Sequence, residues 1–163
     1  MEAVVTQRTT ETPASPAVSA APALQGWPQR VLLAVDDTAE SHKAVALAAK
    51  VAGQSNAEVI AVHVHPIEPR KWGPYEVETR FEAFSLVHDA VAELRTAGVK
   101  SRGIVINAPI DRVGDAIGTQ ADRLDADLVV MGARNLSGIS QLFGGSVSRD
   151  AARKAHCPVT LAS

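Results

Sequence analysis

The 163-residue sequence is poor in cysteine, in aromatic residues and in net charge. Its one cysteine, Cys157, excludes an internal disulfide framework and a metal cluster built from several cysteines. Lys and Arg number 16 against 18 Asp and Glu, so no basic excess is present to neutralise nucleic-acid phosphates. We therefore expect no nucleic-acid partner. With only 4% aromatic residues, the core must be built from Val, Ala, Leu and Ile.

Long hydrophobic runs are also missing. No apolar run approaches the ~20 residues that a membrane span requires. The N-terminus is a poor signal peptide, because acidic residues and prolines interrupt the apolar stretch that such a peptide needs. We therefore expect a cytoplasmic protein with no membrane partner.

The first 26 residues differ in composition from the rest. Residues 1–26 are rich in Ala, Pro and Thr and contain no aromatic residue. Such a segment buries too little apolar surface to offset its ordering entropy, so we predict a disordered tail, with a docking segment as the alternative. Residues 27–163 have the length of one domain.

From Trp27 onward, short apolar runs alternate with amphipathic segments. The expected strands are residues 31–35, 59–64, 103–106, 128–131 and 159–162, and the expected helices are 41–52, 77–94, 111–124 and 146–155. This alternation predicts an α/β fold: an open, five-stranded parallel sheet with helices on both faces. Gly53 is the expected end of the first helix. We interpret the proline-rich residues 66–75, with Trp72 and Tyr75, as a loop that is either a lid or a partner surface.

Ligands of open parallel sheets bind beyond the carboxyl ends of the strands. Asp36 and Asp37 follow the first expected strand, Val64 ends the second, and the glycine-rich residues 132–145 follow the fourth. Ser146 then opens a helix, whose free N–H groups and dipole favour a phosphate. The pattern predicts a phosphate cradle, or alternatively a plain loop with a capped helix. No Gly-Lys-Ser/Thr triplet of a Walker loop occurs.

The spacing in this loop resembles the signature of the universal stress protein (UspA-like) family: Gly, two residues, Gly, nine residues, Gly, then Ser or Thr. Here Gly132, Gly145 and Ser146 fit, while Asn135 stands where the family has its second glycine. Further similarity lies in residues 31–36, 63–64, 131–132 and 156–159. The resemblance extends from residue 30 to residue 163.

The resemblance implies an ATP-binding regulatory protein with an adenine-nucleotide-binding, Rossmann-like fold. Mg²⁺ or Mn²⁺ would accompany the ATP. By position in the family pattern, Asp36 and Val64 would hold the adenosine. The phosphates would be surrounded by Gly132, Asn135, Gly145, Ser146 and Val147, with Met131 and Ser148 as further contacts. Asn tolerates the left-handed backbone and can donate its amide to a phosphate, but it is bulkier than glycine, so we expect retained but weaker binding.

The family resemblance also implies a homodimer. The apolar last strand, residues 159–162, is a candidate edge that pairs with its mate across a two-fold axis. The alternative function is a nucleotide-free homodimeric interaction module of the same fold. We assign no catalytic residue, because no base and no group that stabilises charge at a γ-phosphate can be identified, and we expect slow ATP hydrolysis at most.

Three other features have competing interpretations. The Asp36-Asp37 pair is also typical of phosphoacceptor receiver domains, but these need a strand-ending Asp and Lys that are missing here. His63 and His65 share one face of a strand, where a structural role is favoured over metal binding. Cys157 is interpreted as a small buried residue rather than a reactive thiolate.

Overall fold

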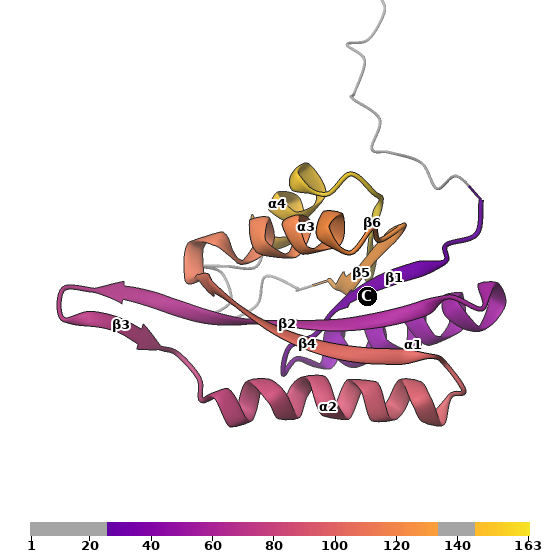
Figure 1. Cartoon of the computed structure of the whole chain (residues 1–163), viewed down its shortest axis with the longest axis horizontal. Coiled ribbons are helices and arrows are strands. Elements are labelled where there is room, and N and C mark those ends of the chain that lie inside the picture. Colours follow the sequence, from indigo (N-terminus) through magenta and orange to yellow (C-terminus); the bar gives the residue numbers. More distant parts are fainter. Residues whose placement is uncertain (1–25, 134–145) are drawn as a thin grey trace, which may run out of the picture.

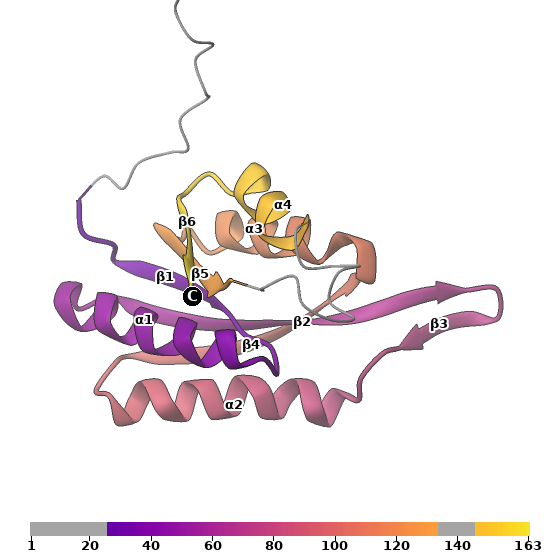
Figure 2. The same cartoon turned by 180° about the vertical axis from the view of Figure 1, so that it is seen from behind.

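The computed structural model describes residues 26–133 and 146–163. Its strands are β1 (Arg30–Ala34), β2 (Glu58–Arg70), β3 (Gly73–Glu76), β4 (Ser101–Pro109), β5 (Leu128–Gly132) and β6 (Val159–Ala162). Its helices are α1 (Ala39–Ser55), α2 (Arg80–Thr96), the 3₁₀ turn η1 (Ile110–Arg112), α3 (Val113–Arg123) and α4 (Ser146–Lys154). Helices α1 and α2 cover one face of a sheet, and α3 and α4 cover the other (Figures 1 and 2). In this described part, no helix has the length and apolarity that crossing a membrane requires.

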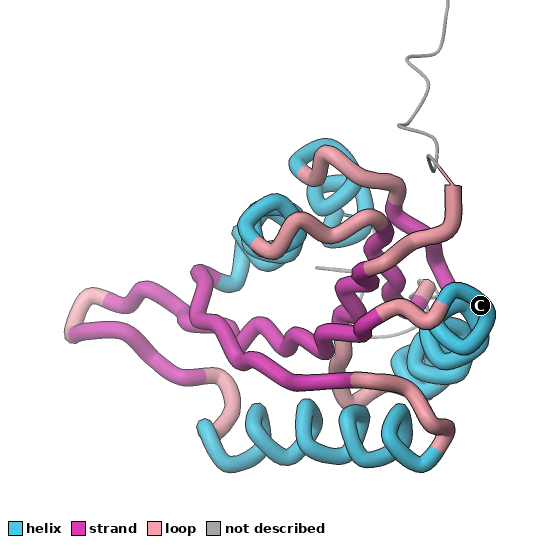
Figure 3. The backbone as a smooth tube through the Cα atoms, turned by 45° about the vertical axis from the view of Figure 1, so that its right-hand side comes forward, coloured by secondary structure: helices cyan, strands magenta, loops and turns pink. Residues whose placement is uncertain are grey.

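Five of the strands form a parallel sheet in the order β4-β2-β1-β5-β6. Figure 3 shows the strands running between the two helical layers. The predicted α/β class with helices on both faces is therefore confirmed. The predicted number of strands is wrong by one, because β3 adds a sixth strand that pairs antiparallel with β2. The order of the strands along the sheet reverses at β1, which lies between β2 and β5.

Strand β1 shows why the sequence has apolar runs rather than alternation. Val31 and Leu33 belong to the core beneath α1 and α2, whereas Leu32 belongs to the core beneath α3 and α4. All three side chains are fully buried. A parallel strand buried on both faces must be apolar at every position.

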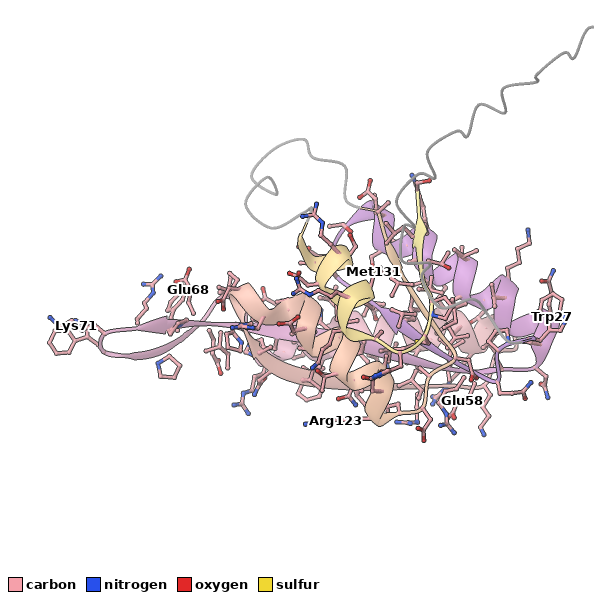
Figure 4. The ribbon with its side chains drawn as sticks, turned by 90° about the horizontal axis from the view of Figure 1, so that it is seen from above. Trp27, Glu58, Glu68, Lys71, Arg123 and Met131 are labelled. Carbon is pink, nitrogen blue, oxygen red and sulfur yellow. The ribbon has the colours of Figure 1, made fainter. Side chains whose placement is uncertain are left out.

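The proline-rich segment is not a loop, as the sequence suggested, but an arm of two strands. Strand β2 continues to Arg70 and turns back into β3, so that Pro69 opposes Pro74. The last β2 residue paired with β1 is Val62, so beyond it β2 no longer has β1 beside it. Proline lacks an N–H and is tolerated where a strand loses a neighbour. The tip, with Lys71, projects far from the body (Figure 4).

Two helix boundaries also differ from expectation. Helix α1 passes through Gly53 and ends at Ser55, so the expected stop at Gly53 is wrong. Asn56, with a φ of 55°, supplies the left-handed cap. Helix α2 begins three residues later than expected. Thr79 caps it in a capping box with Glu82, whose pKa is lowered by hydrogen bonds from the Thr79 amide and hydroxyl. Val77 is left in the connection between β3 and α2.

Helices α3 and α4 approach each other closely at glycines. A Cβ atom built on Gly118 would lie 2.6 Å from Lys154 Cβ and 2.9 Å from the Ala155 nitrogen. One built on Gly114 would lie 2.5 Å from the Val147 carbonyl oxygen. The two helices pack at a distance that a larger residue would not allow, and this packing places the start of α4 beside the carboxyl ends of the strands.

We expect Gly118→Ala to destabilise the protein by about 1–3 kcal/mol, because the new methyl group must displace the backbone of α4. Gly53→Ala is the matched control, since it also lies inside a helix but has nothing within 4 Å of the added atom. This control should stabilise the protein by about 0.5–1 kcal/mol through helix propensity alone. Urea unfolding of both variants measures the two changes in the free energy of unfolding. Changes of the same sign would contradict the packing argument.

Candidate functional site

A cavity of about 400 Å³ opens where β1 and β5 end, beside the part of β2 that continues past β1. This volume is within the range of small-ligand sites. Its described walls come from every layer of the fold: Ala34, Val35, Asp36, Asp37, Val62, His63, Val64, Pro66, Val77, Glu78, Leu86, Ile110, Val113, Ile117, Met131, Gly132, Val147 and Ser148. The cavity lies at the reversal of strand order, where ligands of open α/β sheets bind.

Six of the nine predicted site residues line this one cavity: Asp36, Val64, Met131, Gly132, Val147 and Ser148. Two others, Asn135 and Gly145, lie outside the described residues. Ser146 is the first residue of α4. The six come from the ends of β1 and β5, the middle of β2 and the start of α4, so the fold brings together residues that are separated by up to 112 positions, from Asp36 to Ser148. Their role in binding stays a prediction.

Asp36 is held in the turn between β1 and α1. Its Oδ1 accepts hydrogen bonds from the Thr38 amide, at 3.0 Å, and from the Thr38 hydroxyl. Its own amide donates to Ser41 Oγ at 3.0 Å. Thr38 is in turn the N-cap of α1. The sequence Asp-Asp-Thr therefore ends the strand, forms the turn and starts the helix, and it leaves Asp36 on the cavity wall.

Gly132 serves close packing at the end of β5. A Cβ atom there would lie 2.7 Å from the Glu40 carbonyl carbon and 2.8 Å from its oxygen. The strand end thus lies directly against the first turn of α1. This contact is a reason for glycine that is independent of any ligand, and it brings the ends of β1 and β5 to the same wall of the cavity.

The charges of the cavity are unevenly placed. Its described lining contains three carboxylates, on Asp36, Asp37 and Glu78, and no Lys or Arg. Val147 and Ser148, in the first turn of α4, border a different part of the wall. The N-terminus of a helix presents unpaired N–H groups and a partial positive charge. An anionic group of a ligand is therefore favoured at α4 and disfavoured near the carboxylates.

His63 and His65 both contact Glu78, which precedes α2. His63 Nδ1 lies 2.8 Å from the Val35 carbonyl oxygen, and its Nε2 contacts the Glu78 carboxylate. His65 Nε2 donates to the Glu78 carbonyl oxygen at 2.9 Å, and its Nδ1 lies 3.3 Å from Asn107 Oδ1. All four ring nitrogens thus have protein partners. Within the described residues no group of three or more His, Cys, Asp or Glu could hold a metal ion.

The sequence did not point to the wall formed by Pro66, Val77, Glu78 and Leu86. These residues reach the cavity only because the arm folds back and delivers the chain to α2 beside β2. No local pattern marks Glu78 as a cavity residue. Cys157, by contrast, is buried as expected, and burial together with the nearby carboxylates of Asp122 and Asp127 raises the pKa of its thiol. A raised pKa disfavours the reactive thiolate.

A sequence model described as the universal stress protein family matches residues 28–163. A universal stress protein from Thermus aquaticus is 30% identical over 134 residues, which cover 80% of this chain and 96% of the relative.

Two solved structures of universal stress proteins from Archaeoglobus fulgidus have the same fold. One is 27% identical with a TM-score of 0.68 and the other, a complex with dAMP, is 26% identical with a TM-score of 0.65. Each match covers 83% of this chain and 98% of the other. On the family match over residues 28–163, on the 30% identity and on the shared fold, the chain belongs to the universal stress protein family.

Proposed function

We propose that this protein binds an adenine nucleotide, ATP in the first place, in the cavity at the ends of β1 and β5 and beside β2. Nucleotide occupancy is then the regulatory signal that a partner recognises. The observation that carries the proposal is the cavity itself, which gathers six of the residues expected from the sequence around a helix N-terminus. The complex of a related Archaeoglobus fulgidus protein with dAMP supports the choice of an adenine nucleotide.

The charges of the cavity support one orientation of the nucleotide. The phosphates would lie at the start of α4, near Val147 and Ser148, together with the glycine-rich segment that precedes it. The adenosine would lie toward Asp36 and Val64, where carboxylate oxygens accept hydrogen bonds from hydroxyl or amino groups. Mg²⁺ or Mn²⁺ would be carried mainly by the phosphate oxygens, since the described residues provide no cluster of three or more ligating side chains.

Calorimetric titration of the full chain with ATP, AMP and dAMP tests this proposal. We expect one site per chain, with a Kd for ATP of about micromolar order. ATP should bind more tightly than AMP, because its longer phosphate chain makes more contacts with N–H donors, and chelation of Mg²⁺ should weaken ATP binding. Folded protein that gives no signal with any of the three nucleotides would refute the proposal.

A matched pair of variants tests the orientation. Ser148→Glu places a negative charge in the first turn of α4, where it suits the helix but repels a phosphate. We expect its Kd for ATP to rise at least about tenfold, which corresponds to a repulsion of ~1.4 kcal/mol or more. Ser148→Gln has similar size without the charge and should change the Kd far less. Equal effects of the two substitutions would mean that the phosphates do not lie at α4.

The alternative function is a nucleotide-free homodimeric module, and one observation favours a dimer. Strand β6 pairs only with β5 among the described residues, and Leu161 on it is 45% exposed. An apolar strand with an unpaired edge is a ready site for pairing with a second copy. This feature is compatible with nucleotide binding, so the dimer is part of the proposal in either case.

We expect Leu161→Lys to convert a dimer to monomer, because a charge on an edge strand opposes pairing. Phe84→Lys is the control: it adds the same charge at an exposed apolar residue on α2, which covers the part of the sheet formed by β2 and β4. Light scattering during gel filtration over a concentration series measures the mass. A wild-type chain that stays monomeric throughout would exclude the proposed dimer.

A further inference from the structure

We propose that the outer edge of β4, together with a groove between β4 and α3, binds an extended, acidic segment of a partner protein as an additional strand of the sheet. Strand β4 ends the sheet on the side opposite β6, and in the described part of the chain it pairs with β2 alone. The groove shares no lining residue with the nucleotide cavity, and the inference does not depend on nucleotide binding.

The hydrogen bonds to β2 determine which backbone groups of β4 face outward. The Val59 amide of β2 donates to the Lys100 carbonyl oxygen at 2.9 Å, and Val59 is in register with Ser101. Bonding residues alternate along a parallel ladder, so the even-numbered residues of β4 direct their N–H and C=O groups to β2. The odd-numbered residues, 101, 103, 105 and 107, therefore direct theirs away from the sheet.

This outer edge is closed at both ends and open in the middle. At its start, Arg95 Nη2 donates to the Ser101 carbonyl oxygen at 3.1 Å. At its end, Pro109 has no N–H to donate. Between them, no hydrogen bond from the described residues reaches the backbone groups of Gly103, Val105 and Asn107. These groups are spaced to bond a neighbouring strand of about five residues, a common strand length.

The open part of the edge also lacks the residues that usually protect edge strands, which are charged residues and prolines. Residues 103–107 have the sequence Gly-Ile-Val-Ile-Asn, with no charge and no proline. Ile104, Val105 and Ile106 are each partly exposed, and β-branched residues of this kind suit the interior of a sheet. The edge therefore offers both unpaired backbone groups and apolar side chains that an added strand would cover.

A groove of about 280 Å³ lies between this edge and α3. Its described lining comes from residues 106–109, from Arg112 and from α3. The volume is slightly below the ~300–1,000 Å³ of small-molecule sites, so the groove suits the side chains of a bound segment better than a separate ligand. Successive side chains of a strand point to opposite faces, so every second side chain of an added strand would lie over the groove.

The charge of the groove favours acidic side chains. Its described lining contains two arginines, Arg112 and Arg123, and one carboxylate, that of Asp115. Asp115 is already paired with Arg112 at 3.1 Å and with Arg153 at 3.6 Å. Arg123 is exposed at the end of α3 (Figure 4), and no described carboxylate lies within ion-pair distance of it.

A carboxylate on the added strand would therefore supply a partner for Arg123. Strand β4 contains no carboxylate of its own, so the β4 strand of a second copy would not supply one. The complementary occupant is thus an acidic segment from a different protein.

Titration of the full chain with blocked peptides, without nucleotide and followed by fluorescence anisotropy, tests this proposal. The probe is a labelled seven-residue peptide that alternates Val and Glu, and its twin has Gln in place of Glu. We expect the Glu peptide to occupy one site per chain with a Kd of about 0.1 mM or tighter. The Gln twin should bind about two- to fivefold more weakly, the difference that an exposed ion pair makes.

Two N-methylated forms of the Glu peptide test the backbone pairing. One is methylated at its Val residues and the other at its Glu residues. Only every second N–H of a strand faces a given neighbour, so one form should lose affinity by about tenfold or more and the other should bind like the parent peptide. Equal affinities of the two forms would mean that the segment does not bind as a strand, which overturns the proposal.

Matched variants locate the site. Val105→Pro removes an outward N–H without removing a bond to β2, whereas Val105→Thr keeps that N–H on a side chain of similar shape. We expect the proline to weaken peptide binding by about tenfold or more and the threonine far less. Arg123→Glu should abolish the preference for the Glu peptide over the Gln twin. Lys50→Glu, at an exposed position of α1 on the other face of the sheet, should leave this preference unchanged.

The Arg123 variant and the N-methylated pair decide the question even if Val105→Pro does not fold. No saturable binding of the Glu peptide, or a preference for it that survives Arg123→Glu, overturns the proposal. Light scattering during gel filtration tests a second copy as the occupant instead. Equal masses of wild type and folded Val105→Pro support the acidic partner, whereas a smaller mass of the variant would assign the edge to a second copy and overturn it.

Discussion

The parallel pairing of β1 with β2 on one side and with β5 on the other is the contact on which the rest of the structure depends. Leu32 illustrates this pairing, because it is fully buried and lies opposite Ile60 on β2 and Val129 on β5. The chain adds strands outward from β1 first in one direction and then in the other. The two neighbouring connections therefore leave in opposite directions, and the gap between them becomes the cavity. The reversal places the walls at the ends of β1 and β5, whereas the wall with Val77 and Glu78 depends on the arm that folds back along β2.

Glycines determine how closely the layers approach this sheet. A Cβ atom on Gly103 would lie 2.0 Å from a methyl group of Val87 on α2, and one on Gly132 would meet the backbone of α1. Gly114 and Gly118 do the same between α3 and α4. A glycine inside a helix costs about 0.5–1 kcal/mol relative to alanine. Gly114 and Gly118 therefore give up local stability for a close contact between two helices of the same layer. The start of α4 reaches the cavity as a consequence.

The sequence predicted the layers well and the arm poorly, for the same physical reason. Apolar runs such as residues 31–35 are unambiguous because burial on both faces removes every polar residue. The arm lacks that constraint. Beyond Val62, β2 is no longer paired with β1. Its prolines and exposed side chains in this part resemble those of a loop. Trp72, which is 93% exposed, has no packing partner that a periodic pattern could reveal.

The site shows the same division. Asp36, Gly132 and Ser148 lie at strand ends or at the start of a helix, so the topology alone brings them together. The family signature is a second reason to predict them as site residues. Glu78 reaches the cavity because β2 runs for thirteen residues and the chain then turns back along it. No local residue spacing encodes this path. The sequence favours a structural role for His63 and His65 over metal binding, and Glu78, which both histidines contact, lies across that turn. A residue that reaches the site only because the chain turns back cannot be identified from local sequence motifs.

The uneven charge of the cavity connects its two ends. The lining contains three carboxylates and a buried imidazole, and the start of α4, where a helix N-terminus carries a partial positive charge, also borders it. A ligand with a phosphate tail and a polar, uncharged head is complementary to both ends in one orientation only. Glu78 also contacts His63 on β2, so a carboxylate of the cavity joins the connection before α2 to the sheet. The topology that brings these elements to one cavity therefore also sets its charge distribution.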